Sequence, residues 1–311
     1  MTLPPYGKMT ETHMFAMREC AFVPSAWRGP EGSPKSADQQ YQEFLQQTLE
    51  VIKENLWPEH TSSGWQGASA RHMVELTRTD LDLMLTIQSD RLLDQSIYPS
   101  DPNVSKTHRE LFLREDTGSE SFGAHYGDYD PGALFALTDR MSKLGDVGLA
   151  RTVANGPLTL KLKLQRPRAY QTAMIFGLTD FIYLEADTAC TPSIFSGHCL
   201  QGALCLGSIL EQLLNSGTPV TDRMLQYTAD IGDRRVMAGA HYPSDNLASW
   251  LMVFLSAPFV FRNKNVRPLL WKALQEHSTV YKRIVDSGNS IYSPALQAVH
   301  DAYSGSLAIC L

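Results

Sequence analysis

The sequence lacks the features that mark nucleic-acid-binding proteins and small disulfide-rich proteins. It has 27 Lys and Arg residues against 33 Asp and Glu residues, a formal net charge of -6. A protein that grips a nucleic-acid backbone clusters an excess of cations, so we expect no nucleic-acid partner. Five Cys residues among 311 are too few and too irregularly spaced for a disulfide framework, which favours reduced thiols in a reducing compartment.

Long apolar runs, targeting segments and metal motifs are also scarce. The most apolar run, Leu247 to Phe261, is interrupted by Pro258 and falls short of the roughly 20 residues of a bilayer span. It predicts a buried core helix and a soluble protein. The first 20 residues show no cationic start followed by an apolar stretch, so we expect no secretory signal and a cytoplasmic location. No His-Glu-x-x-His, paired Cys-x-x-Cys or EF-hand pattern predicts a metal site.

What the sequence does contain is helical periodicity. Residues 1–35 are rich in Pro and Gly and predict an extended arm, after which Ser36 and Gln39 resemble a capping box. Residues 98–132 are turn-rich, as in a lid, a binding loop or a surface loop. Apolar residues at helical spacing predict helices over 41–56, 72–93, 132–145, 147–164, 169–178, 197–215, 221–231, 244–262, 266–284 and 293–302.

This pattern predicts an all-α protein with a single helical-bundle domain and an N-terminal extension. We assign residues 1–70 to an N-terminal arm and helix packed on the core, and residues 71–311 to the main helical domain, which the motifs described below mark as catalytic. Homo-oligomer formation stays open.

Three segments carry groups that suit phosphate chemistry. In Lys161 to Arg168, two cations lie seven positions apart, two turns of a helix, so both can face one anion. Ser196-Gly197-His198 precedes an apolar helix, whose N-terminus is a natural phosphate seat.

The third segment runs from Arg235 to Asp245. Asp245 follows His241 by four residues, so in a helix that starts near Pro243 its carboxylate can accept from one imidazole nitrogen. The other nitrogen is then left to act as a nucleophile.

Taken in order, the three segments resemble the motifs of the phosphatidic acid phosphatase type 2 and haloperoxidase superfamily, and in particular its soluble bacterial class A acid phosphatases. The first motif fits Lys161 and Arg168, although Arg166-Pro167 offers a second register for the arginine that binds phosphate. The departures are Ala169, Phe195 and Arg234, where the family has Pro, Pro and Ser. The other matching residues are Ser196, Gly197, His198, Arg235, His241 and Asp245.

The resemblance implies a metal-independent phosphatase that hydrolyses a phosphomonoester or a diphosphate ester of a small molecule. His241 is expected to form a phosphohistidine, Asp245 to orient it, and His198 to act as general acid and base. The resemblance also implies that the phosphate oxygens are bound by Lys161, Arg168, Ser196, Gly197 and Arg235. No cofactor is implied for a phosphatase.

Two alternatives remain from the sequence. The same superfamily contains vanadium-dependent haloperoxidases, in which the equivalent of His241 holds vanadate and the reaction uses peroxide and halide. A third hypothesis is an anion-binding protein without catalytic activity.

Overall fold

The structure is a computed structural model that describes residues 27, 29–30, 32–59, 67–97, 106–116, 159–186, 189 and 191–311. Within these residues the chain forms helices and no strand, with Ser96 and Thr107 joined in an isolated antiparallel bridge. The all-α prediction is therefore confirmed for this part of the chain. The helices predicted over 132–145 and most of 147–164 lie outside the described residues, whereas residues 159–164 are helical.

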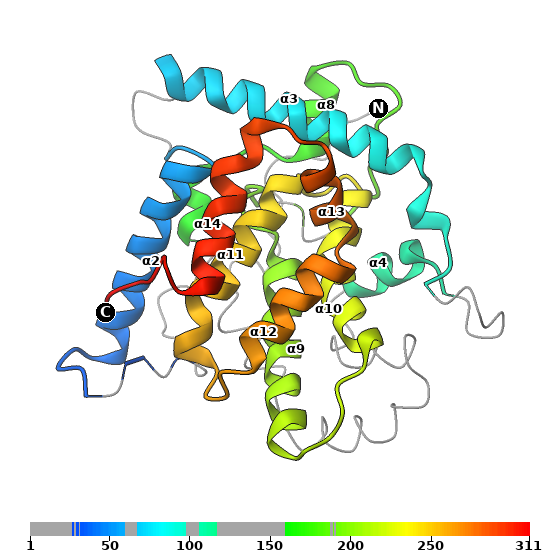
Figure 1. The fold of residues 1–311 in the computed structure, drawn as a ribbon. Helices are drawn as coiled ribbons and strands as arrows, with labels where there is room; N and C mark the ends of the chain where they lie inside the picture. Colours follow the sequence, from blue (N-terminus) through cyan, green and yellow to red (C-terminus); the bar gives the residue numbers. More distant parts are fainter. Residues whose placement is uncertain are drawn as a thin grey trace.

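The C-terminal half forms a bundle around one central helix (Figure 1). The central helix, α11, packs against α9 and α14, and α10 packs against α9. These helices span Gly197–Asn215 (α9), Asp222–Met237 (α10), Pro243–Val260 (α11) and Ser293–Ser304 (α14).

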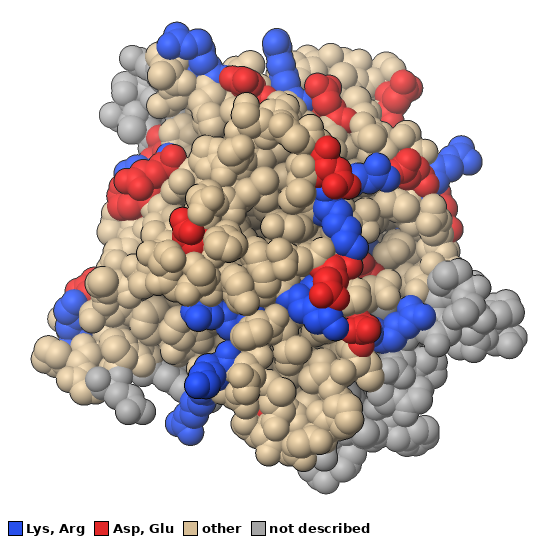
Figure 2. All heavy atoms as spheres, in the orientation of Figure 1, with Lys and Arg blue, Asp and Glu red and all other residues tan. Residues whose placement is uncertain are grey.

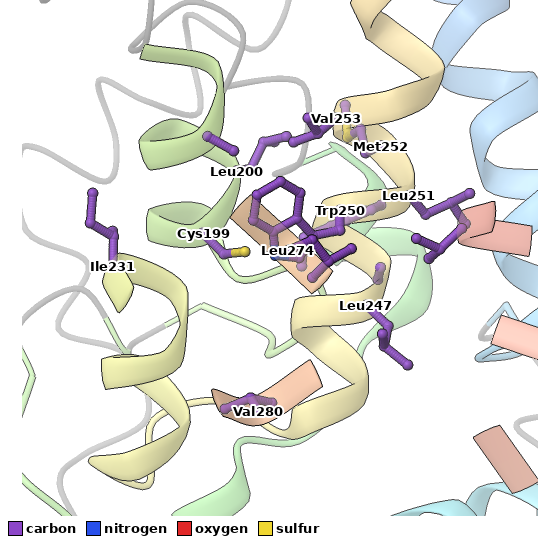
Figure 3. Close-up of a cluster of buried hydrophobic side chains, with 14 of the residues drawn as sticks. Cys199, Leu200, Ile231, Leu247, Trp250, Leu251, Met252, Val253, Leu274 and Val280 are labelled. Carbon is purple, nitrogen blue, oxygen red and sulfur yellow. The ribbon is translucent and has the colours of Figure 1, made fainter. Parts of the chain in front are cut away.

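Helix α11 is central because its sequence is apolar on every side, a composition that requires a helix to be surrounded. Its residues from Leu247 to Ala257 are all buried, as the sequence predicted for this run. Figure 3 shows side chains of α9, α10 and α11 meeting in one cluster that includes Cys199, Ile231 and Trp250. Among the described helices, none is long and apolar enough to cross a membrane.

Two N-terminal helices flank the bundle. Helix α2, Ala37–Asn55, begins at the predicted capping box, in which the Ser36 hydroxyl accepts from the Gln39 N–H and the Gln39 side chain accepts from the Ser36 N–H. It packs against α11 and α14. Helix α3, Gly67–Ser89, crosses one end of the bundle at the top of Figure 1 and contacts α10, α11 and α13. Trp27 packs on α2 through ring contacts with Tyr41 and Phe44.

Two segments differ most from the sequence-based prediction. Helix α4, His108–Asp116, lies within the turn-rich region, because it buries Leu111 and Phe112 against α10 although most of its residues are polar. The helix predicted over 266–284 is divided, because Ser278 caps a new helix through its hydroxyl. The divided region consists of α12 (Val266–Lys272), a π-helical turn (Ala273–His277) and α13 (Thr279–Asp286).

Charged side chains of both signs share the surface. On the face drawn in Figure 2, Lys and Arg of the described residues lie among Asp and Glu rather than in an extended band of one sign. The charges that matter most for the candidate site are not on this surface but in the interior.

Candidate active site

Three connecting segments meet beside the N-termini of α9 and α11. They are residues 165–168 before α8 (Ala169–Ile175), the loop 191–196 before α9, and the turn between α10 and α11. The Ser193 N–H donates to the Arg166 carbonyl at 2.8 Å, and the Ser249 hydroxyl donates to the Ser196 carbonyl at 3.0 Å. The three predicted motifs, far apart in the sequence, thus converge on one region.

The predicted contact between His241 and Asp245 is present. Helix α11 begins at Pro243, and Nδ1 of His241 lies 3.2 Å from Oδ2 of Asp245. The same oxygen accepts from the Ser193 hydroxyl at 2.5 Å and from the Tyr242 N–H at 3.0 Å. Burial alone would raise the pKa of Asp245, but the Arg166 charge and these hydrogen bonds hold the pKa well below its usual value.

The other nitrogen of His241 faces Arg168. Nη1 of Arg168 lies 2.7 Å from Nε2 of His241, and because a guanidinium can only donate, Nε2 must carry the lone pair. The proton of the neutral ring is therefore on Nδ1, where Asp245 accepts it. Burial, together with the Arg168 and Lys161 charges, lowers the pKa of His241 well below its usual value, so the ring is neutral at neutral pH.

The two arginines of the first motif have different places. Arg168 contacts His241, whereas Arg166 lies behind Asp245 and donates to its Oδ1 at 2.8 Å. Arg166 also donates to the Ser244 hydroxyl and to Oδ2 of Asp80, both at 2.7 Å. Of the two registers open in the sequence, the geometry therefore places Arg168 rather than Arg166 beside the candidate nucleophile.

Two aromatic rings lie close to the guanidinium of Arg166. Its Cζ lies 4.4 Å from the ring centroid of Trp57 and 3.9 Å from that of Tyr242, within cation–π range. The side chain is fully buried. Burial would lower its pKa, but the Asp245 and Asp80 charges raise the pKa above its usual value.

Lys161 is close to the site but does not share a helix with Arg168. The helix that carries Lys161 ends at residue 164, and Gln165 adopts a left-handed φ of 48° that turns the chain. The expectation of two cations stacked over two helical turns is wrong for this reason. The Lys161 ammonium donates to the carbonyls of Pro192, Ser193 and Phe195 at 2.7, 3.1 and 2.5 Å and so anchors the loop before α9.

The second motif forms the N-terminus of α9, as its sequence predicts. Ser196 is the N-cap, and its hydroxyl accepts from the Cys199 N–H at 3.4 Å. A Cβ built on Gly197 would meet no atom within 4 Å, so there is open space beside the first residue of the helix. Nε2 of His198 lies 3.2 Å from the Glu115 carbonyl. Because a carbonyl only accepts, this nitrogen carries a proton.

Helix α4 contacts Arg235 and His198, a role of this helix that the sequence did not reveal. The Arg235 Cζ lies 4.4 Å from the ring centroid of Phe112. The neighbouring Arg234 forms a buried ion pair with Glu115, whose carbonyl contacts His198. The short, polar sequence of α4 gives no periodic signal, so neither Phe112 nor Glu115 could be assigned to the site in advance.

Comparisons with known proteins supply no family for this chain. Neither family models, nor curated proteins, nor solved structures gave a match. The function is therefore proposed from the geometry of the site and from the motifs in the sequence.

Proposed function

We propose that this chain is a phosphatase that hydrolyses a phosphomonoester or diphosphate ester through a phosphohistidine at His241. The observation that supports it most is the state of the His241 ring. Asp245 holds the Nδ1 proton, so Nε2 of the neutral imidazole carries the lone pair of the nucleophile, which accepts a hydrogen bond from a fixed cation, Arg168.

In the first step, Nε2 of His241 attacks phosphorus and the bond from phosphorus to the ester oxygen breaks. The leaving oxygen takes a proton from His198, which enters this step as an imidazolium and donates from Nδ1, because its Nε2–H is directed at the Glu115 carbonyl. The phosphorylated ring carries a positive charge, which the Asp245 carboxylate stabilises through Nδ1.

In the second step, water attacks phosphorus and the phosphorus–nitrogen bond breaks. His198 accepts a proton from this water, and His241 returns to its neutral state. The proposed phosphate-binding site consists of Arg168, Arg235 and the N–H groups at the N-terminus of α9, which begins at Gly197. Lys161 fixes the loop that leads into this N-terminus. In this proposal, fixed cations neutralise the phosphoryl oxygens in place of a metal ion.

The proposal is tested with p-nitrophenyl phosphate and the His241→Ala variant. We expect kcat/KM to fall at least roughly a thousandfold, the scale seen when a covalent nucleophile is removed. Wild-type enzyme should yield a phosphoenzyme after an alkaline quench and should keep its activity in EDTA. His300→Ala, which removes an exposed histidine of α14, is the matched control. Wild-type turnover by His241→Ala would refute the proposal.

Vanadate separates the proposal from its alternatives. It should inhibit ester hydrolysis, because its trigonal-bipyramidal form resembles the transition state. Bromination of a dye by the vanadate-loaded protein with peroxide and bromide would instead identify a haloperoxidase. Phosphate binding without turnover of any ester would identify an anion-binding protein.

A further inference from the structure

A continuous chain of contacts leads from α3 to the candidate nucleophile. Oδ2 of Asp80 accepts from Arg166 at 2.7 Å, Oδ1 of Asp245 accepts from Arg166 at 2.8 Å, and Oδ2 of Asp245 lies 3.2 Å from Nδ1 of His241. Asp80, Arg166 and Asp245 are fully buried, and His241 is 3% exposed. Water therefore screens these charges poorly, and each acts strongly on the next.

The charges in this chain do not cancel. One cation, Arg166, lies between the carboxylates of Asp80 and Asp245, which leaves a net charge of -1 behind His241. Burial raises the pKa of Asp80 above its usual value, but four donors, two from Ser244 and one each from Tyr292 and Arg166, favour its carboxylate form. The excess negative charge is matched when the His241 ring becomes positive.

Arg166 is fixed more firmly than a simple counter-ion requires. Two of its nitrogens contact three different groups, and the rings of Trp57 and Tyr242 lie within cation–π range of its guanidinium. A lysine cannot reproduce this planar fork. The direction of the Asp245 carboxylate, and hence the orientation of the His241 ring, depends on this arrangement.

We propose that Arg166 and Asp80 are positioning residues, which act through Asp245 to set the charge and orientation of His241. The inference rests on the proposed function only in treating His241 as the nucleophile. Neither residue is proposed to touch the substrate. Arg166 contacts Asp245, whereas Arg168 contacts His241 directly.

A network that only attached α3 to the bundle would make a different prediction. Loss of any member would then lower stability without a signed effect on His241. If the network sets the charge behind His241, loss of the cation and loss of the outer carboxylate must act in opposite directions. The other charged groups that act on His241, Arg168 and Lys161, are unchanged in the variants below.

The test uses Asp80→Asn, Arg166→Gln and the double variant in the full-length protein. The protonation of His241 is followed by long-range ¹H–¹⁵N NMR from pH 4 to 9 without substrate, and its signal is assigned by its loss in His241→Gln. Arg166→Gln should raise the pH of His241 protonation, and Asp80→Asn should lower it, each on the order of one pH unit. The double variant restores the net charge of -1 and should return close to wild type.

The acid limb of kcat/KM on p-nitrophenyl phosphate should move in the same directions. If Arg166→Gln does not fold, the test is the comparison of Asp80→Asn with the double variant. Without Arg166, the double variant buries one carboxylate, whereas Arg166→Gln buries two. Shifts of one sign in both single variants, or a double variant unlike wild type, would overturn the inference. The NMR result is independent of turnover, so absence of ester hydrolysis would count against the proposed function alone.

Discussion

The guanidinium of Arg168 donates to Nε2 of His241 at 2.7 Å, which joins the residue before α8 to the turn before α11. Arg168 is held in place by the Thr191 carbonyl at 2.6 Å and the Ala240 carbonyl at 3.1 Å. The hydrogen bond lies along the lone pair that would attack phosphorus. A phosphoryl group must therefore take over the Arg168 donor before the nitrogen can react.

This relationship predicts the behaviour of Arg168→Met. Burial and the Arg168 cation both lower the pKa of His241, so removal of the cation raises that pKa toward its usual value. More of His241 is then protonated at acidic pH, and the acid limb of kcat/KM should move to higher pH. We also expect kcat to fall about a hundredfold, as when one oxyanion donor is lost. A pH–rate profile of wild type and variant measures both effects, and an acid limb at lower pH would contradict them.

The buried ion pair between Glu115 and Arg234 predicts a large loss of stability in Glu115→Ala. Both side chains are fully buried, and the variant leaves the Arg234 cation without this carboxylate. We expect the free energy of unfolding to fall by about 3–5 kcal/mol in guanidinium titrations. Asp94→Ala, which removes an exposed ion pair with Arg109, is the control and should cost less than about 1 kcal/mol. Equal losses in the two variants would show that α4 is not fixed by this pair.

Helices with strong apolar periodicity could be predicted well from the sequence. Helix α9 spans the predicted 197–215, because a serine cap precedes an uninterrupted apolar pattern. Helix α10 was predicted to end at residue 231 but continues to Met237. Its last turns carry buried charges, among them Asp233 and Arg234, whose partners lie on α13 and α4. Helical periodicity contains no signal for partners supplied by other helices.

The site could be predicted only in part for a similar reason. The spacing of His241 and Asp245 within one helical turn determines their contact, so the sequence was sufficient there. The separate places of Lys161 and Arg168 depend on the left-handed turn at Gln165, which no glycine marks in the sequence. Asp80 lies 86 residues from Arg166 and looks like an ordinary polar residue of α3.

The close approach of α9 and α10 predicts that Gly232→Ala is destabilising. A Cβ on Gly232 would lie 2.7 Å from the sulfur and 2.8 Å from the Cβ of Cys199, closer than real contacts allow. The two helices must separate, at a cost of about 1–3 kcal/mol in the free energy of unfolding. Gly197→Ala places a methyl group in open space and is the control for stability. Thermal unfolding compares the two, and a Gly232→Ala protein as stable as wild type would show that the interface can relax.

The buried carboxyl group of Asp233 should make the free energy of unfolding fall as the pH rises. Burial, and after it the charge of Asp230, raises the pKa of Asp233 from 3.8 to about 7, although hydrogen bonds from Val280 and Ser278 oppose the rise. Between these two pH values the folded protein keeps a proton that the unfolded chain releases, so stability is present at low pH and is lost as the pH approaches 7. Asp233→Asn cannot ionise, and it should reduce the difference in unfolding free energy between pH 5 and pH 8 by about 2 kcal/mol. Urea titrations at the two pH values measure this difference, with Asp286→Asn, an exposed residue at the end of α13, as the control. An unchanged difference in Asp233→Asn would mean that the carboxylate is already ionised in the folded protein at pH 5.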